Sequence, residues 1–103
     1  MYLFVLLFVQ KEVGEGVCEY HIFDPGNFAH KMPKELKRGN YHQWGLKKQD
    51  ANSTPNADGR YQGLHDIIKL LGHEHLDTID IFKIDCEKVR WVECDFSAVI
   101  RRY

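Results

Sequence analysis

Acidic side chains directly follow two apolar runs of this sequence, at positions where they could take part in chemistry. Asp24 follows the run CEYHIF, and Asp85, with Glu87 close behind it, follows TIDIFKI. A carboxylate at the end of a strand can accept both hydroxyl hydrogens of a ribose, and Asp24 is the better placed of the two aspartates for such a contact. Asp-Pro-Gly is also a common turn sequence, so a purely structural role for Asp24 stays open.

Strands and helices that alternate along the chain must position these carboxylates. Leu64, Ile67, Ile68 and Leu71 recur at helical spacing, and the run before Asp85 is apolar almost throughout, which suits a strand covered on both faces. The expected elements are a strand at 18–23, one or two helical turns within 29–38 begun by Pro33, a strand at 41–46, a helix from Tyr61 to Gly72 and a strand at 78–84. This order predicts an α/β domain with a mainly parallel sheet and crossover helices.

Length, composition and charge restrict the class of protein. The chain has 103 residues, of which 44% are hydrophobic and 28% charged, and this predicts one compact globular unit. A net charge of -1, with Lys and Arg scattered along the chain, gives no footprint for nucleic acid. Three cysteines without CxxC spacing indicate reduced thiols, so we expect a cytoplasmic protein.

The first residues are strongly apolar. The run from Met1 to Val9 is too short to cross a bilayer, which takes roughly 20 residues. It lacks the basic start and the cleavage site of a signal peptide, although secretion or membrane association stays open. The alternative is a buried strand or helix whose start is missing from an incomplete gene model. We therefore separate residues 1–17, an apolar segment of open role, from an incomplete domain at 18–103.

Four segments together resemble a known family. The segments CEYHIFDP, YHQWGL and IDIFKIDCE, with the helical stretch LHDIIKLLGHE, resemble in order and spacing the eukaryotic methyltransferase-like proteins related to FkbM-type methyltransferases. The resemblance runs from about Cys18 to Trp91, and the pair FDP and KIDCE is its most specific part. It implies a partial Rossmann-like fold that binds S-adenosylmethionine and transfers a methyl group, with this chain supplying the second, third and fourth strands.

The resemblance also implies roles for individual residues. Asp24 resembles the acidic residue that holds the cofactor ribose, and Trp44, Gly45 and Leu46 fall on the adenine side of the pocket. Asp85 and Glu87 fall near the methyl group and the acceptor, where a carboxylate could orient the acceptor or take its proton. The expected cofactor is S-adenosylmethionine, and the methyl acceptor stays unidentified.

Departures from the family pattern support a second hypothesis. The glycine-containing loop after the first strand has no counterpart, because Gly14 and Gly16 stand immediately before the strand at 18–23. Lys88, Val89 and Arg90 replace the residues that the family usually places before Trp91, and the later strands are missing. The chain could instead be a non-catalytic or truncated remnant that acts as an interaction module, with self-association through an exposed sheet edge.

The histidines suggest a metal site only weakly. His73 and His75 form His-x-His with Asp77 and Asp80 nearby, but this segment reads as a loop without a helical or strand frame to fix ligand geometry. His21 and His42 are interpreted as half-buried sheet residues. We therefore assign no metal ligands from the sequence.

Overall fold

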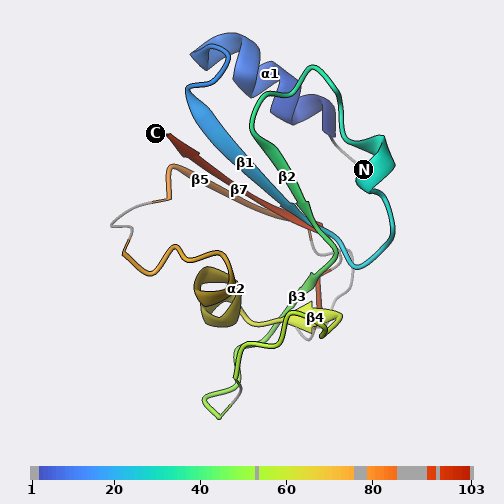
Figure 1. Ribbon diagram of the computed structural model, residues 1–103, viewed down its shortest axis with the longest axis vertical. Coiled ribbons are helices and arrows are strands. Elements are labelled where there is room, and N and C mark those ends of the chain that lie inside the picture. Colours follow the sequence, from blue (N-terminus) through green and yellow to red (C-terminus); the bar gives the residue numbers. More distant parts are fainter. Residues whose placement is uncertain (1–2, 53, 76–78, 86–92, 95, 103) are drawn as a thin grey trace.

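Two small sheets and two helices make up the part of the chain that the computed structural model describes, namely residues 3–52, 54–75, 79–85, 93–94 and 96–102 (Figure 1). The larger sheet has the order β2-β1-β7-β5, formed by β2 (Gly39–His42), β1 (Cys18–Phe23), β7 (Phe96–Arg102) and β5 (Ile81–Asp85). The smaller sheet has the order β4-β3-β6, formed by β4 (Tyr61–Gln62), β3 (Gly45–Lys47) and β6 (Glu93–Cys94). The helices are α1 (Leu3–Val13), α2 (Leu64–Leu70) and the single 3-10 turn η1 (Ala29–Lys31).

The sheets are mixed, so the expectation of a mainly parallel sheet is wrong, while the α/β class is confirmed. β1 and β2 run parallel, but β7 lies antiparallel between β1 and β5, and β6 is antiparallel to β3. The reason lies in the connection: β5 ends at Asp85 and β7 begins at Phe96. A right-handed crossover takes a dozen or more residues, so this shorter link returns the chain in the opposite direction.

The central strand β1 is buried on both faces, and its start and end match the prediction. Tyr20 and Ile22 belong to a first core cluster that also contains Leu6 of α1. Phe23 belongs to a second cluster with Ile67 of α2 and β7 residues. The two helices therefore lie on opposite sides of the four-stranded sheet, as Figure 1 shows, and the strand needs apolar or paired side chains at every position.

The apolar N-terminal run forms α1 and packs on the sheet. Leu6 is 2% exposed, and the buried Gln10 side chain donates to the backbone oxygen of Glu35 at 2.8 Å and accepts from the amide of Lys37 at 2.7 Å. Phe8 on the outer side is 63% exposed. Among the described helices none is long and apolar enough to cross a membrane.

Proline explains why the predicted helical turns within 29–38 differ from the structure. The turn η1 ends before Pro33, whereas we expected Pro33 to begin it. Met32 is extended, with φ -61° and ψ 128°, because a residue that precedes proline is sterically disfavoured in helical conformation. The predicted strand at 41–46 is likewise divided, into β2 and β3, which belong to different sheets.

The helix α2 begins later than predicted, at Leu64, because Tyr61 and Gln62 pair as β4. Its first amides receive a cap from a distant side chain: Gln49 Oε1 accepts from the amide of His65 at 3.0 Å. The helix is followed by Gly72, whose φ of +70° suits the left-handed residue that commonly ends helices. This end matches the prediction.

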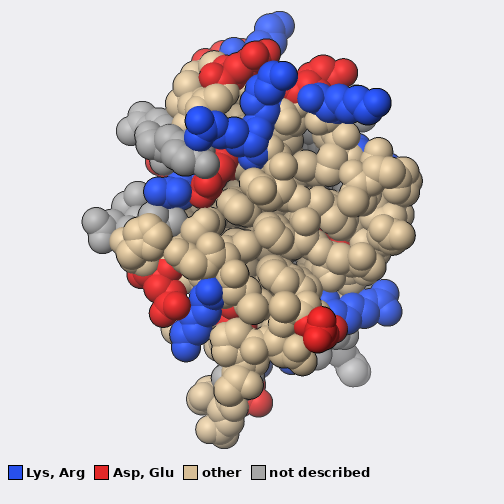
Figure 2. Space-filling model, viewed as in Figure 1, with Lys and Arg blue, Asp and Glu red and all other residues tan. Residues whose placement is uncertain are grey.

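The strand β5 lies at the edge of the larger sheet, so the prediction that both of its faces are covered is wrong. Ile81 is 43% exposed and Ile84 is 44% exposed. Ile81 and Ile84 are three positions apart and therefore lie on opposite faces of β5, so neither face is fully covered. On the face drawn in Figure 2, blue and red side chains lie mostly around the rim of a large uncharged area, with both signs interspersed.

Candidate functional site

The carboxyl end of β1 continues into a turn formed by Asp24, Pro25 and Gly26. The side chain of Asp24 is buried, and its Oδ1 accepts a hydrogen bond from the amide of Gly26 at 2.8 Å. This bond is the turn contact that the sequence offered as the alternative to a ribose contact. A carboxylate has a second oxygen, so the turn contact and a bond to a ribose hydroxyl are chemically compatible.

The hydroxyl of Tyr41 ties this turn to β2. It accepts from the amide of Phe28 at 3.2 Å, and it is placed to donate to the carbonyl of Asp24 at 3.1 Å or to the carbonyl of Gly26. Burial raises the pKa of Tyr41, so the hydroxyl keeps its proton for donation. Two side chains therefore stabilise this turn: the carboxylate of Asp24 itself and the hydroxyl of Tyr41 on the neighbouring strand β2.

Aromatic rings stack beside the turn, on the α2 side of the sheet. The His42 ring lies 5.2 Å from the indole of Trp44 and 5.1 Å from the Phe23 ring, all nearly parallel. The indole Nε1 of Trp44 donates to the carbonyl of Ala57 at 2.9 Å. These contacts fix the orientation of the half-buried indole next to the carboxyl ends of β1 and β2.

An open pocket of about 710 Å³ lies at the carboxyl ends of the parallel strands β1 and β2. Cofactor sites are typically about 300–1,000 Å³, so its size suits a nucleotide-like molecule. In open α/β sheets, ligands bind outside the carboxyl ends of the strands. The lining comes from the turn after β1, the end of β2 and the long surface loop: Pro25, Tyr41, His42, Gln43, Trp44, Ala57, Asp58, Gly59 and Arg60.

The sequence profile of a methyltransferase domain family matches residues 7–99 of this chain. The chain belongs to this methyltransferase domain family. Membership implies a Rossmann-like fold, and it agrees with the small α/β structure and its mixed sheet. No curated protein and no solved structure gave a significant match.

The resemblance placed three residues on the adenine side of a cofactor pocket, and the structure separates them. Trp44 lines the open pocket at the carboxyl ends of β1 and β2. Gly45 is buried in β3, where its amide donates to the carbonyl of Arg60 at 2.8 Å. Leu46 packs against the second core cluster. The cofactor roles of these residues stay predictions.

The two acidic residues predicted for the acceptor side of the methyltransferase fall at the limit of the described structure. Asp85 closes β5, opposite Phe96 of β7, as a residue at a strand end should. Glu87 lies outside the described residues, as do Cys86 and Trp91. Their roles in acceptor binding stay predictions.

The sequence assigned no site role to the polar lining residues of this pocket, namely Tyr41, His42, Gln43, Asp58 and Arg60. Two of them, Asp58 and Arg60, lie within or directly after the polar stretch QDANSTPNADG. The stretch folds back over the carboxyl end of β2, because Gln62 Nε2 donates to the carbonyl of Gly59 at 3.0 Å and holds the loop end. The density of Asp and Asn in this loop was the signal that could have marked it as part of a site.

Proposed function

We propose that this chain carries the adenosine-binding half of an S-adenosylmethionine-dependent methyltransferase related to the FkbM-type enzymes. Family membership supports methyl transfer as the chemistry, since S-adenosylmethionine supplies a methyl group activated on a sulfonium. The observation that carries the proposal is the pocket at the carboxyl ends of β1 and β2, directly beside Asp24. The acceptor stays unidentified.

The residues around this pocket fit an adenosine. Asp24 directly precedes the lining residue Pro25, and its buried carboxylate keeps Oδ2 for a ribose hydroxyl while Oδ1 accepts from the amide of Gly26. The indole of Trp44 lines the pocket and is held in place by stacking and by its bond to Ala57, so it offers a fixed apolar surface for the adenine. Asp85, at the end of β5, is the proposed acceptor-side carboxylate.

One observation favours the second hypothesis, a non-catalytic module with this fold. In a doubly wound sheet the strand order is 3-2-1-4, so the place between β1 and β5 belongs to the first parallel strand. In the described structure the antiparallel β7 takes that place. The glycine loop that follows a first parallel strand therefore has no counterpart there, and the methionine half of the cofactor has no described site.

The test is the affinity of the purified full chain for S-adenosylmethionine, measured by calorimetry on the wild type and on Asp24→Asn. An asparagine keeps an oxygen that can accept from the amide of Gly26, so the turn persists, but it removes the charge. Hydrogen bonds to charged groups contribute about 1.5–3 kcal/mol, so we expect affinity to fall roughly 10- to 150-fold.

The matched control is Asp50→Asn. Asp50 is an exposed aspartate outside the pocket whose Oδ1 accepts from the amide of Asn52 at 2.9 Å, the same kind of turn as at Asp24. We expect wild-type affinity for this variant. Lack of binding by a folded wild-type chain contradicts the methyltransferase proposal and supports the interaction module. Binding that is equally strong in Asp24→Asn contradicts the proposed ribose contact.

A further inference from the structure

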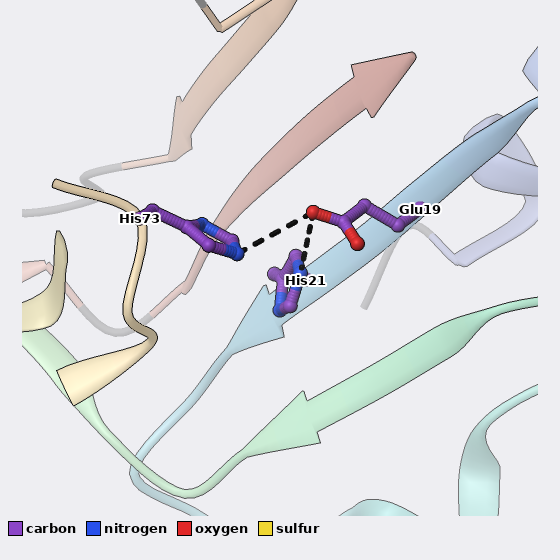
Figure 3. Close-up of side chains that lie close together, drawn as sticks. All are labelled: Glu19, His21 and His73. Carbon is purple, nitrogen blue, oxygen red and sulfur yellow. Dashed lines mark ion pairs between the residues drawn. The ribbon is translucent and has the colours of Figure 1, made fainter. Parts of the chain in front are cut away.

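A carboxylate and two imidazoles from separate parts of the chain converge beside β1, as Figure 3 shows. Glu19 and His21 lie two residues apart on β1, so their side chains project from the same face of the sheet. His73 follows α2, directly after Gly72. One ligand atom of each of the three side chains lies within 4.8 Å of the others. The cluster uses only one histidine of the HEH sequence, because His75 is exposed.

The distances in the cluster have the scale of a zinc site. The Oε1 atom of Glu19 lies 3.5 Å from Nε2 of His21 and 3.4 Å from Nε2 of His73 (Figure 3). Two ligands that share a tetrahedral zinc ion, each about 2.0–2.1 Å from it, lie roughly 3.3 Å apart. Two edges of such a site therefore already have nearly the right length, and small side-chain shifts close the third.

The Nε2 atom of His21 is the nitrogen of the cluster that the hydrogen bonds of the described residues leave without a partner. The Nδ1 atom of His21 lies 3.0 Å from Nε2 of His42, so a hydrogen is shared between these two rings. Nε2 of His21 is buried and has no hydrogen-bond partner among the residues that the structure describes. With the hydrogen on Nδ1, as in metal-bound histidines that donate their other N–H to a neighbour, the Nε2 lone pair of His21 faces the Glu19 carboxylate and is available to a cation. With the hydrogen on Nε2, the same ring instead points an N–H toward Glu19.

Arg101 is the group that opposes a cation here. Its Nη1 lies 3.0 Å from the same Oε1 of Glu19. A metal-bound carboxylate commonly accepts hydrogen bonds in addition, so Arg101 can bond the other oxygen while Oε1 binds the ion. His73 also lines a cavity of about 330 Å³ beside α2, which gives an ion and a fourth ligand from solution a way in.

We propose that Glu19, His21 and His73 form a binding site for a divalent transition metal ion of the zinc type, with a fourth position open to water. Two histidines and one carboxylate are a known donor set for zinc. The ion would connect β1 to the segment after α2, two parts far apart in sequence. None of the three ligands lines the pocket at the carboxyl ends of β1 and β2, although His21 shares a hydrogen with His42, which does line it.

The test is titration of the chelator-treated full chain with ZnCl2 by calorimetry, and with CoCl2 by visible absorption. We expect one zinc ion per chain and the intense visible bands of four-coordinate Co²⁺. Because even the loss of an outer partner weakens metal binding 10- to 100-fold, we expect His73→Gln to weaken zinc binding at least tenfold. The matched control is His75→Gln, from the same HEH sequence, and it should bind zinc like the wild type.

Circular dichroism establishes that each variant is folded. Should His73→Gln fail to fold, Glu19→Gln takes its place, since it retains the shape and one oxygen but removes the charge, and it should also bind zinc at least tenfold more weakly. The proposal is wrong if the folded wild type binds no zinc, if His75→Gln loses as much affinity as the ligand variant, or if Glu19→Gln binds zinc as tightly as the wild type.

Discussion

Two tyrosines of neighbouring strands should respond in opposite directions to the loss of their hydroxyl groups. Tyr20 in β1 is 1% exposed, and its hydroxyl is buried without a hydrogen-bond partner among the residues of the described structure. Tyr41 in β2 is half-buried, and its hydroxyl holds the turn at Asp24 and Gly26. We therefore predict that Tyr20→Phe stabilises the protein and that Tyr41→Phe destabilises it.

The magnitudes follow from the hydrogen bonds of each hydroxyl. A buried polar group without a partner costs about 1–3 kcal/mol, so Tyr20→Phe should raise the free energy of unfolding by roughly 1 kcal/mol or more. The Tyr41 hydroxyl accepts one bond, from Phe28, and donates one to the turn. At about 1 kcal/mol for each bond, Tyr41→Phe should lower the free energy of unfolding by roughly 1–3 kcal/mol.

The assay is urea unfolding followed by circular dichroism, with the midpoint compared at a constant slope. A change of 1 kcal/mol corresponds to about 4–8 °C in Tm for a domain near this size, so thermal unfolding provides a second measurement. The pair controls itself, because both changes remove the same atom from the same residue type. A Tyr20→Phe protein that is less stable than the wild type, or a Tyr41→Phe protein that is equally stable, would refute the reasoning.

Two further predictions concern the helix end and the pH dependence. Gly72→Ala should lower the free energy of unfolding by about 1 kcal/mol, as measured by urea unfolding. Gly72 has a φ of +70° and open space where an alanine Cβ would stand, so the substitution adds only backbone strain. An unchanged urea midpoint would contradict this account. Burial lowers the pKa of His42 from 6.5 to about 4, so the folded state binds fewer protons than the unfolded state between these values. The free energy of unfolding should therefore reach its maximum above about pH 6.5 and decrease as the pH drops toward 4. In His42→Phe, which keeps a ring in the stack, this decrease should be smaller. Urea unfolding at several pH values measures both.

The sequence predicted those helix and strand ends that depend on a few neighbouring residues. The strand at 18–23 was predictable because an apolar run stops at Asp-Pro-Gly, and the end of α2 was predictable because Gly72 follows a helical repeat. An open pocket lined by Pro25 lies at the carboxyl end of β1, where ligands bind in open α/β sheets, but the ligand contacts predicted there stay predictions. In each case the decisive residues lie within a few positions of one another.

Features that depend on pairing between distant segments were not predictable in this way. No strand was predicted at β7, because nothing in FSAVIRR indicates that it inserts antiparallel beside β1. The same limit applies to the cluster of Glu19, His21 and His73, since spacing favoured the neighbours His73 and His75, whereas the fold brings His73 to β1. Such contacts depend on which distant segments pair in the fold, and a single sequence contains little information about that pairing.

The place of β7 has a consequence for how the protein is made. Cys18 of β1 pairs with Arg102 of β7, and β7 is the last of the described elements to leave the ribosome. Until then β1 has its neighbour β2 but an open edge on the other side, and closing so long a loop slows folding. During synthesis, the edge of β1 that later pairs with β7 is therefore exposed and can aggregate. Folding of the larger sheet should be completed only after residue 102 has been synthesised.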